Sequence, residues 1–241
     1  MIEITALASG STGNAYRVSD GQTPLLLEAG IPIKAIMRGL GYKLSEIQAV
    51  LVSHSHMDHA KAAGDVLKAG IEVYMSQPTA DALGATGHRV RILEPRAQVQ
   101  IGSWAVLPFE TQHDCPGSMG FLLASGDQKL VYITDSYYVR WRFNSLTHVM
   151  VECNYSDDIL SANVAAGVVP AVLRDRLLQS HFSLEHVKDF LRANDLSRLE
   201  EVWLLHLSDG NSDAERFKRE IMQLTGRPVY VAGGTDRLTH I

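Results

Sequence analysis

The chain has 241 residues with a formal net charge of -5, and 46% of its residues are apolar and 20% charged. This composition fits an ordinary globular protein with a single domain over residues 1–241, and it argues against a broad basic surface for nucleic acid. No stretch approaches about 18 consecutive apolar residues, so we expect no membrane span. Cys115 and Cys153 suggest no disulfide framework, and from the strand-like start at Met1 we expect no signal peptide. We therefore expect a cytoplasmic protein.

The first part of the chain is predicted to alternate short strands with short helices. Strands are expected at 2–8, 15–19, 24–27, 47–52 and 71–75, with a turn at Asp20-Gly21 between the second and the third. Helices are expected at 32–40, 58–68 and 78–83. Gly41 and Gly70 act as stop signals for the first two of these helices.

A run of strands follows, and the last part of the chain is mainly helical. Strands are expected at 90–93, 104–108, 120–124, 130–133, 149–151, 202–205 and 229–231. Helices are expected at 157–165, 170–178, 183–193 and 213–224. Because strands and helices are mixed in both halves, the pattern predicts an α/β fold of two sheets with helices outside.

The segment His54-Ser55-His56-Met57-Asp58-His59 carries the strongest functional signal, and it directly follows the predicted strand at 47–52. Histidine is the commonest metal ligand, because its neutral ring nitrogen suits divalent transition metals. Alternate residues of an extended segment point the same way, so His54 and His56 can share one ion. Asp58 and His59 fall on the following turn, within reach of a second ion. Solvated loop histidines are the alternative.

Three further candidate ligands stand at the ends of apolar strands. His113 follows the strand at 104–108, Asp135 follows the strand at 130–133, and His206 follows the strand at 202–205. A carboxylate such as Asp135 can bridge two cations. Taken singly, Asp135 can equally be a capping residue, and His113 and His206 can equally be hydrogen-bonded histidines of the core.

The pattern His-x-His-x-Asp-His resembles the signature of the metallo-β-lactamase fold superfamily, and the later candidates follow in that superfamily's order. The resemblance implies a four-layer αββα sandwich of two mixed β-sheets flanked by helices. It also implies two divalent metal ions, for which nitrogen and oxygen ligands suit zinc or manganese. The implied ligands are His54, His56 and His113 for one ion, Asp58, His59 and His206 for the other, and Asp135 for both.

Other segments resemble the YycJ (WalJ)-type branch of this superfamily, which is thought to act on DNA as exonucleases. The segments, in order, are 7–15, 134–137, 151–155, 180–183 and 205–208. Two positions depart from the branch. Glu28 stands where aspartate is usual for support of the metal loop, and Phe182 stands where leucine is usual.

Glu152 and His181 are similar to a Glu/His pair of the tRNase Z type of endonuclease, in which the pair lies beside the metals and helps to protonate the leaving oxygen. Phosphodiester cleavage needs such an acid, because an expelled alkoxide is a poor leaving group. A carboxylate next to a histidine raises the imidazole pKa and fixes its tautomer. The alternative is structural, with Glu152 binding backbone at a strand end and His181 next to a helix N-terminus.

The sequence therefore predicts a dinuclear metal-dependent hydrolase, most simply a phosphodiesterase or nuclease that cuts DNA by means of a metal-activated hydroxide. Asp58, Glu152 and His181 are its expected catalytic residues. DNA is the expected partner, no membrane is expected, and no protein partner is indicated. One alternative is a small-molecule hydrolase of the same fold, a cyclic phosphodiesterase or a lactonase, which the acidic net charge favours. Another is a regulatory or scaffold protein that keeps the metal loop for stability.

Weaker signals remain open. The segment 137–143 interleaves aromatic rings with arginines, which suits either stacked bases and phosphates or a packed loop. The loop at 9–14 can offer backbone N–H groups to a phosphate or can be a plain turn. Cys115 is expected to be a buried thiol rather than a ligand. Surface or hydrogen-bonded roles are expected for the remaining histidines, His88, His148, His186 and His240.

Overall fold

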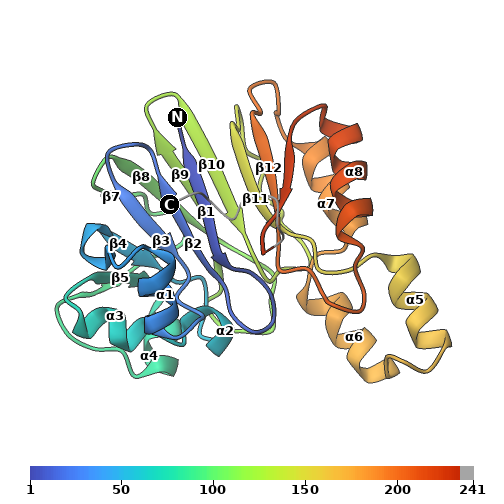
Figure 1. Cartoon of the computed structure of the whole chain (residues 1–241), viewed down its shortest axis with the longest axis horizontal. Coiled ribbons are helices and arrows are strands. Elements are labelled where there is room, and N and C mark those ends of the chain that lie inside the picture. The colour runs from blue at the N-terminus through green and yellow to red at the C-terminus, as the bar shows by residue number, and fades with distance from the viewer. Residues whose placement is uncertain (234–241) are drawn as a thin grey trace.

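The computed structural model describes residues 1–233 and shows two β-sheets packed face to face, with helices on both outer faces (Figure 1). Helices α1, α3 and α4 cover one sheet, and α7 and α8 cover the other. The predicted αββα sandwich of two mixed sheets is confirmed. The assignment of residues 1–241 to a single domain stays a prediction.

The first sheet contains the N-terminal strands. Its order is β1 (Glu3–Ala8), β2 (Ala15–Ser19), β3 (Pro24–Leu27), β4 (Ala49–Leu51), β5 (Glu72–Met75) and β6 (Val90–Ile92). β1, β2 and β3 pair antiparallel, and β3 to β6 pair parallel. The parallel strands consequently all end at the same edge of this sheet.

The second sheet contains the remaining strands. Its order is β13 (Val229–Val231), β12 (Glu201–Leu205), β11 (His148–Glu152), β10 (Gln128–Ile133), β9 (Met119–Ser125), β8 (Trp104–Glu110) and β7 (Val99–Ile101). β10 to β13 pair parallel, and β7 to β10 pair antiparallel. β8 and β10 therefore run in the same direction, and both end at the edge where β11 and β12 end.

The helices are short. They are α1 (Ile33–Gly39), the 3-10 turn η1 (Leu44–Glu46), α2 (Met57–Ala60), α3 (Ala63–Lys68), α4 (Gln77–Leu83), α5 (Asp157–Ala165), α6 (Ala171–Ser180), α7 (Leu184–Ala193) and α8 (Ala214–Thr225). In Figure 1, α5 and α6 lie beside the lower end of the second sheet, below α7 and α8.

Alternation along the strands builds three apolar layers. On β3, Leu25 and Leu27 point into the core between the sheets, whereas Leu26 points into the layer beneath α1 and α3. On β12, Trp203 packs between the sheets and Val202 packs toward α7 and α8. A strand with both faces covered is apolar at nearly every position, which is why residues 25–27 of β3 and 202–205 of β12 are continuous apolar runs.

One predicted helix is wrong in its extent. The expected helix at 58–68 is two separate helices, α2 and α3. The backbone of Ala29 interrupts the helical pattern, because its N–H donates to the carbonyl of His59 at 2.8 Å and its own carbonyl accepts from the N–H of Ala62 at 2.8 Å. The loop after β3 thus takes the hydrogen bonds that a continuous helix would have used. Strand β7 and the turn η1 were not predicted.

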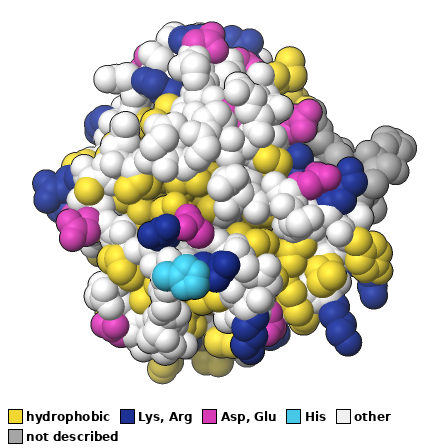
Figure 2. All heavy atoms as spheres, turned by 90° about the vertical axis from the view of Figure 1, so that its left-hand side faces the viewer, with side chains coloured by type: hydrophobic (Ala, Val, Ile, Leu, Met, Phe, Trp, Pro, Cys, Tyr) yellow, Lys and Arg dark blue, Asp and Glu magenta, His cyan; other side chains and the backbone are white. Residues whose placement is uncertain are grey.

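Within residues 1–233, no helix is long and apolar enough to cross a membrane. Figure 2 shows the face of the molecule where α3, α4 and β7 lie. Acidic and basic side chains are scattered there around a central group of apolar side chains, so the atoms described on this face form no single-sign band. A polyanion would find no continuous positive track on this side.

Asp20 links the two sheets at a turn. Its carboxylate accepts from the backbone N–H of Gln22 (2.9 Å) and Thr23 (2.8 Å) and from the Ser125 hydroxyl at the end of β9 (2.5 Å). Partial burial raises the pKa of Asp20, but these hydrogen bonds and one involving Ser103 outweigh it and lower the pKa to about 2.

We expect this contact to be sensitive to acid. Because the folded pKa lies below the unfolded one, Asp20 stabilises the fold above about pH 4, and this contribution is lost as the pH falls toward 2. Asp20→Asn should lower the free energy of unfolding by about 1–2 kcal/mol at pH 7, allowing for solvent screening, and by less near pH 2. Urea unfolding at both pH values measures this. Asp65→Asn, at an exposed position on α3, is the control, and an Asp20→Asn loss that is equal at both pH values would contradict the prediction.

Gly30 lies where three backbone segments meet. Its N–H donates to the Asn14 carbonyl, and the N–H of Asn14 donates to the Asp58 carbonyl, each at 2.8 Å. A Cβ atom at position 30 would lie only 1.7 Å from the Asp58 carbonyl oxygen.

Gly30→Ala is therefore expected to lower the free energy of unfolding by about 3 kcal/mol or more, because backbone must move to make room. Gly64→Ala is the matched control. No heavy atom lies within 4 Å of a Cβ there, and alanine in a helix should stabilise the protein by about 0.5–1 kcal/mol. Denaturant unfolding of the two variants should give shifts of opposite sign.

Candidate metal centre

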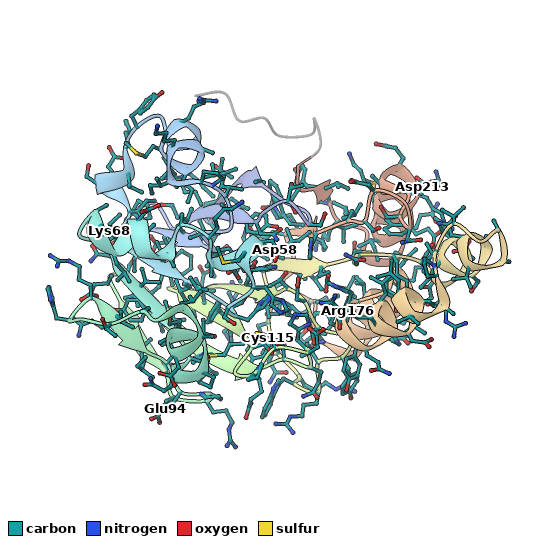
Figure 3. All side chains as sticks on the ribbon, turned by 90° about the horizontal axis from the view of Figure 1, so that it is seen from below. Asp58, Lys68, Glu94, Cys115, Arg176 and Asp213 are labelled. Atoms are coloured by element: carbon teal, nitrogen blue, oxygen red, sulfur yellow. The ribbon has the colours of Figure 1, made fainter. Side chains whose placement is uncertain are left out.

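The predicted site residues meet at the lower edge of the sandwich, where parallel strands from both sheets end. Figure 3 views this edge directly, with Asp58, Cys115 and Arg176 near the middle of the molecule. The strand ends that contribute are β4 before His54, β8 before His113, β10 before Asp135, β11 at Glu152 and β12 before His206. Sheet topology thus brings together side chains that are far apart in the sequence.

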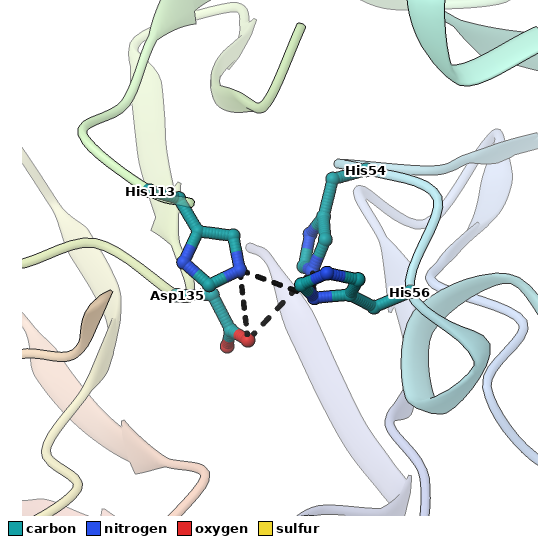
Figure 4. A group of neighbouring side chains, drawn as sticks. All are labelled: His54, His56, His113 and Asp135. Atoms are coloured by element: carbon teal, nitrogen blue, oxygen red, sulfur yellow. Dashed lines mark hydrogen bonds and ion pairs between the residues drawn. The ribbon is translucent and has the colours of Figure 1, made fainter. Parts of the chain in front are cut away.

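Three imidazoles and one carboxylate form the first group (Figure 4). Nδ1 of His56 lies 3.1 Å from Nε2 of His54 and 3.2 Å from Nε2 of His113. Ring nitrogens that converge in this way suit one shared cation, because metal–nitrogen bonds of ~2.0–2.1 Å in a tetrahedron give nitrogen–nitrogen edges of roughly 3.3–3.4 Å. The donor atoms of the group, with Asp135, all lie within 4.8 Å of one another. The arrangement fits a divalent metal ion.

Hydrogen bonds to the far side of two rings set their orientation. Nδ1 of His54 lies 2.9 Å from the Ser53 hydroxyl, and Nδ1 of His113 lies 3.2 Å from the Ser180 carbonyl. A partner on one ring nitrogen fixes the tautomer and directs the other nitrogen toward the metal. Burial is the main factor that lowers the pKa of both His54 and His113, which favours the neutral, ligating form.

Asp135 is at the centre of the constellation and is almost fully buried. Its Oδ1 accepts from Nδ1 of His206 at 2.8 Å, and its Oδ2 lies 3.4 Å from Nε2 of His59 and 3.7 Å from Nε2 of His54. Burial raises the pKa of this carboxyl, but His206 and His59 outweigh burial and keep the pKa well below its usual range. Asp135 is an anion that faces both halves of the site.

The second group contains Asp58, His59 and Asp135. Nε2 of His59 lies 3.3 Å from Oδ2 of Asp58 and 3.3 Å from the amide nitrogen of Asn14. Asn14 also donates to the Asp58 carbonyl at 3.2 Å. This asparagine ties the loop before β2 to the metal loop.

Glu28 lies behind the metal loop. Its carboxylate accepts from the Ser53 N–H, with distances of 3.3 and 3.2 Å to its two oxygens, and Oε2 lies 3.7 Å from Nδ1 of His59. Among the described residues, Nδ1 of His59 has no hydrogen-bond partner, and the Glu28 carboxylate approaches it without forming one. Glu28 adopts a positive φ of 64°. The glutamate therefore lies where it can support the loop and orient His59.

The third group contains Asp135, Glu152, His181 and His206. Nδ1 of His181 lies 2.6 Å from Oε1 of Glu152, and Nδ1 of His206 lies 3.2 Å from the same oxygen. Burial alone would lower the pKa of both histidines, but the carboxylates outweigh it, raising the pKa of His206 to about 10 and that of His181 above its ordinary value. Metal binding to His206 would therefore release a proton.

A cavity of about 360 Å³ opens onto these groups. Asp58, His113, Asp135, His181 and His206 line it, with Leu173 and Leu177 of α6 among the other walls. The site thus combines metal-binding donors with a space of ligand size.

The structure brings together all seven expected ligands and both members of the Glu/His pair. The expected second ligand set, Asp58, His59 and His206, does not form a single group in the structure. His206 instead groups with Asp135, Glu152 and His181, and its Nε2 lies 3.8 Å from Oδ2 of Asp58. The assignment of individual ligands stays a prediction. Sequence reasoning missed the roles of Asn14, Ser53 and the Ser180 carbonyl, because small polar residues beside a motif carry no signal of their own.

The structure also places the remaining cysteine, histidine and loop residues that the sequence singled out. Sγ of Cys115 is buried and lies 3.3 Å from the Ser55 hydroxyl. His148 is buried, with its Nδ1 2.8 Å from the Thr147 hydroxyl, as expected of a hydrogen-bonded histidine. Ser11, in the loop at 9–14, lines the cavity. His240 lies outside the described residues.

Comparison with known proteins agrees with this fold and site. Residues 32–206 match the family model described as Beta-lactamase superfamily domain, and the chain belongs to that superfamily. It is 25% identical over 226 residues to the exodeoxyribonuclease WalJ of Streptococcus pneumoniae serotype 2 (strain D39 / NCTC 7466), covering 87% of this chain and 82% of the relative. It is also 25% identical over 238 residues to the exodeoxyribonuclease YycJ of Bacillus anthracis, covering 92% and 89%.

A solved structure has the same architecture. The metallo-beta-lactamase fold protein YhfI from Bacillus subtilis superposes with a TM-score of 0.73 at 15% identity, covering 96% of this chain and 97% of that one. The resemblance to the metallo-β-lactamase fold is confirmed, and the two exodeoxyribonuclease relatives support the WalJ/YycJ branch.

Metal binding should depend on the central carboxylate. Asp135→Asn keeps the size of the side chain but removes its charge, so we expect the affinity for zinc or manganese to fall at least about 100-fold, with fewer ions retained per chain. His88→Ala, at an exposed histidine, is the control. Elemental analysis after dialysis, together with calorimetric titration, measures both variants. Unchanged binding in Asp135→Asn would contradict the assignment.

Proposed function

We propose that this protein is a metal-dependent phosphodiesterase that degrades DNA as an exonuclease. The observation that carries the proposal is the contact of 2.6 Å between His181 and Glu152, next to a cluster of metal-binding donors. The names of the two exodeoxyribonuclease relatives support a DNA substrate. The proposed place of action is the cytoplasm.

The residues that would hold two divalent ions are those of the expected ligand set, with Asp135 between them. When bound, such ions lower the pKa of coordinated water and neutralise the charge that develops on the phosphate. Zinc and manganese both suit these nitrogen and oxygen donors. Asp58 lines the cavity as an anion, since the neighbouring His59 lowers its pKa against the effect of burial. We assign its carboxylate as the hydrogen-bond acceptor that orients the attacking water.

His181 is the proposed acid for the leaving group. Its Nδ1 is occupied by Oε1 of Glu152, while the other oxygen of Glu152 accepts from the N–H groups of Ser136 and Phe182 at 3.2 Å. The buried carboxylate is therefore fixed in place, and it keeps His181 in one orientation. The protonated ring can then donate from its other nitrogen to the departing oxygen of the phosphodiester.

A small-molecule hydrolase is the second candidate function. It is favoured by the cavity of about 360 Å³, which is the size of a small ligand, and by the net charge of -5. Metal-loaded protein should be tested on end-labelled DNA, end-labelled RNA, bis(4-nitrophenyl) phosphate and an acyl-lactone. Cleavage of DNA and of the small diester supports the proposal, whereas activity on the lactone alone would overturn it.

His181→Ala should reduce the rate of DNA cleavage by about 100-fold or more, with metal content unchanged. Its effect on bis(4-nitrophenyl) phosphate should be much smaller, because 4-nitrophenolate departs without protonation. His186→Ala on α7 is the control histidine. Loss of bound metal in His181→Ala would make this residue a ligand instead, and equal losses on both substrates would exclude the acid role.

A further inference from the structure

We propose that a second cavity, next to the metal centre, binds the nucleotide adjacent to the scissile phosphate. Its base would stack on Tyr137, and its phosphate would bind the guanidinium of Arg176. This inference rests on the proposed function, and it identifies the substrate as a polynucleotide strand rather than a small diester.

The second cavity adjoins the first. It has a volume of about 510 Å³, and His113 and Arg176 line both cavities. The two cavities therefore share these two side chains as a common border. The volume lies within the range of about 300–1,000 Å³ that is usual for ligand sites.

Tyr137 is held firmly beside the site although its ring is accessible. Its N–H donates to the Gln112 carbonyl at 3.0 Å, immediately before His113. The neighbouring Ser136 donates its N–H to Glu152 and its hydroxyl to the Tyr138 carbonyl. Tyr137 itself is 37% exposed and lines the second cavity. A partly exposed aromatic ring that lines a cavity from a backbone fixed by hydrogen bonds suits a stacked base.

The rest of the segment 137–143 has a different role. Val139 and Phe143 are buried in the core beneath α7, and Trp141 donates to the Glu110 carbonyl at 3.2 Å. These contacts anchor the segment, which leaves Tyr137 as the ring that faces the second cavity. Of the two interpretations of segment 137–143, a packed loop therefore applies to Val139, Trp141 and Phe143, and base stacking is proposed for Tyr137.

Arg176 provides the positive charge of the second cavity. Leu173, Arg176, Leu177 and Ser180 fall three or four residues apart on α6, so they share the helix face that borders the cavities. The Arg176 side chain is 65% exposed, and its Nε lies 3.3 Å from Oδ2 of Asp114. Asp114 in turn lies 3.3 Å from Nε2 of His113, which anchors the arginine beside the metal centre. Arginine binds phosphate with two parallel hydrogen bonds.

Acidic groups near this cavity are neutralised. Asp175 also lines it, and its Oδ1 pairs with Arg174 at 2.6 Å. The charge of Asp114 is offset by Arg176 and by any cation held at His113. The contact with Asp114 uses Nε of Arg176, so a phosphate would bind the two terminal nitrogens of the same guanidinium.

Binding to a fluorescein-labelled phosphorothioate oligonucleotide, measured by anisotropy on metal-loaded protein, tests the proposal without turnover. Arg176→Ala and Tyr137→Leu should each raise the Kd about tenfold, since stacking of one base is worth ~1–3 kcal/mol and 1.4 kcal/mol is tenfold. Two matched variants should stay within about twofold. Arg192→Ala removes a similarly exposed arginine that pairs with an aspartate at 3.1 Å, and Tyr138→Leu removes a ring that does not line either cavity.

Hydrolysis of bis(4-nitrophenyl) phosphate, which has no adjacent nucleotide, should fall by a much smaller factor than oligonucleotide binding in Arg176→Ala and Tyr137→Leu, and it should be unchanged in the two matched variants. Wild-type Kd values for Arg176→Ala and Tyr137→Leu would overturn the subsite while leaving the proposed function intact, and so would equal losses on the small diester and the oligonucleotide. Selective loss of oligonucleotide binding in a protein that hydrolyses no diester would support the subsite and overturn the proposed function. Wild-type protein that hydrolyses the small diester without binding the oligonucleotide would overturn the subsite and the DNA substrate.

Discussion

A buried carboxylate surrounded by imidazoles is the constraint on which this structure depends. Asp135 lies between His54, His59 and His206, and an unpaired anion at such a depth would destabilise the fold by several kcal/mol. Positively charged or metal-bound partners must therefore meet it. Asp135 and His206 both adopt positive φ values, 39° and 52°, so the strand ends bend out of regular geometry to direct these side chains inward.

The convergence of side chains requires support from a second layer of contacts. Ser53, the Ser180 carbonyl and Glu28 each contact or approach the far side of a ring in the cluster, and each comes from a different part of the chain. Gly30 lets the loop after β3 approach the Asp58 backbone closely enough to hold the metal loop. The position of the ligands therefore reflects the packing of both sheets and of α6.

The two sheets contribute different residues to the proposed reaction. The first sheet and its loops supply His54, His56, Asp58 and His59. The second sheet and the loops after its strands supply the remaining donors and Glu152, and His181 directly follows α6. Helix α6 covers the cavity with apolar side chains and one arginine. A strand of nucleic acid lying against α6 would thus contact the exposed guanidinium of Arg176 next to the reacting groups of the cavity.

The sequence by itself determined which residue types would act as metal ligands and how the sheets and helices would be layered. Apolar runs such as Leu25 to Leu27 predicted strands, and the histidine motif predicted a metal loop, because these patterns are local. Tertiary structure alone decided where α2 ends, since the backbone of Ala29 takes its hydrogen bonds, and which small polar residues support the rings. It also placed the N–H of His206 on the Ser9 hydroxyl, 197 residues away along the chain. Contacts across such separations depend on how the two sheets pack, and no local spacing in the sequence encodes them.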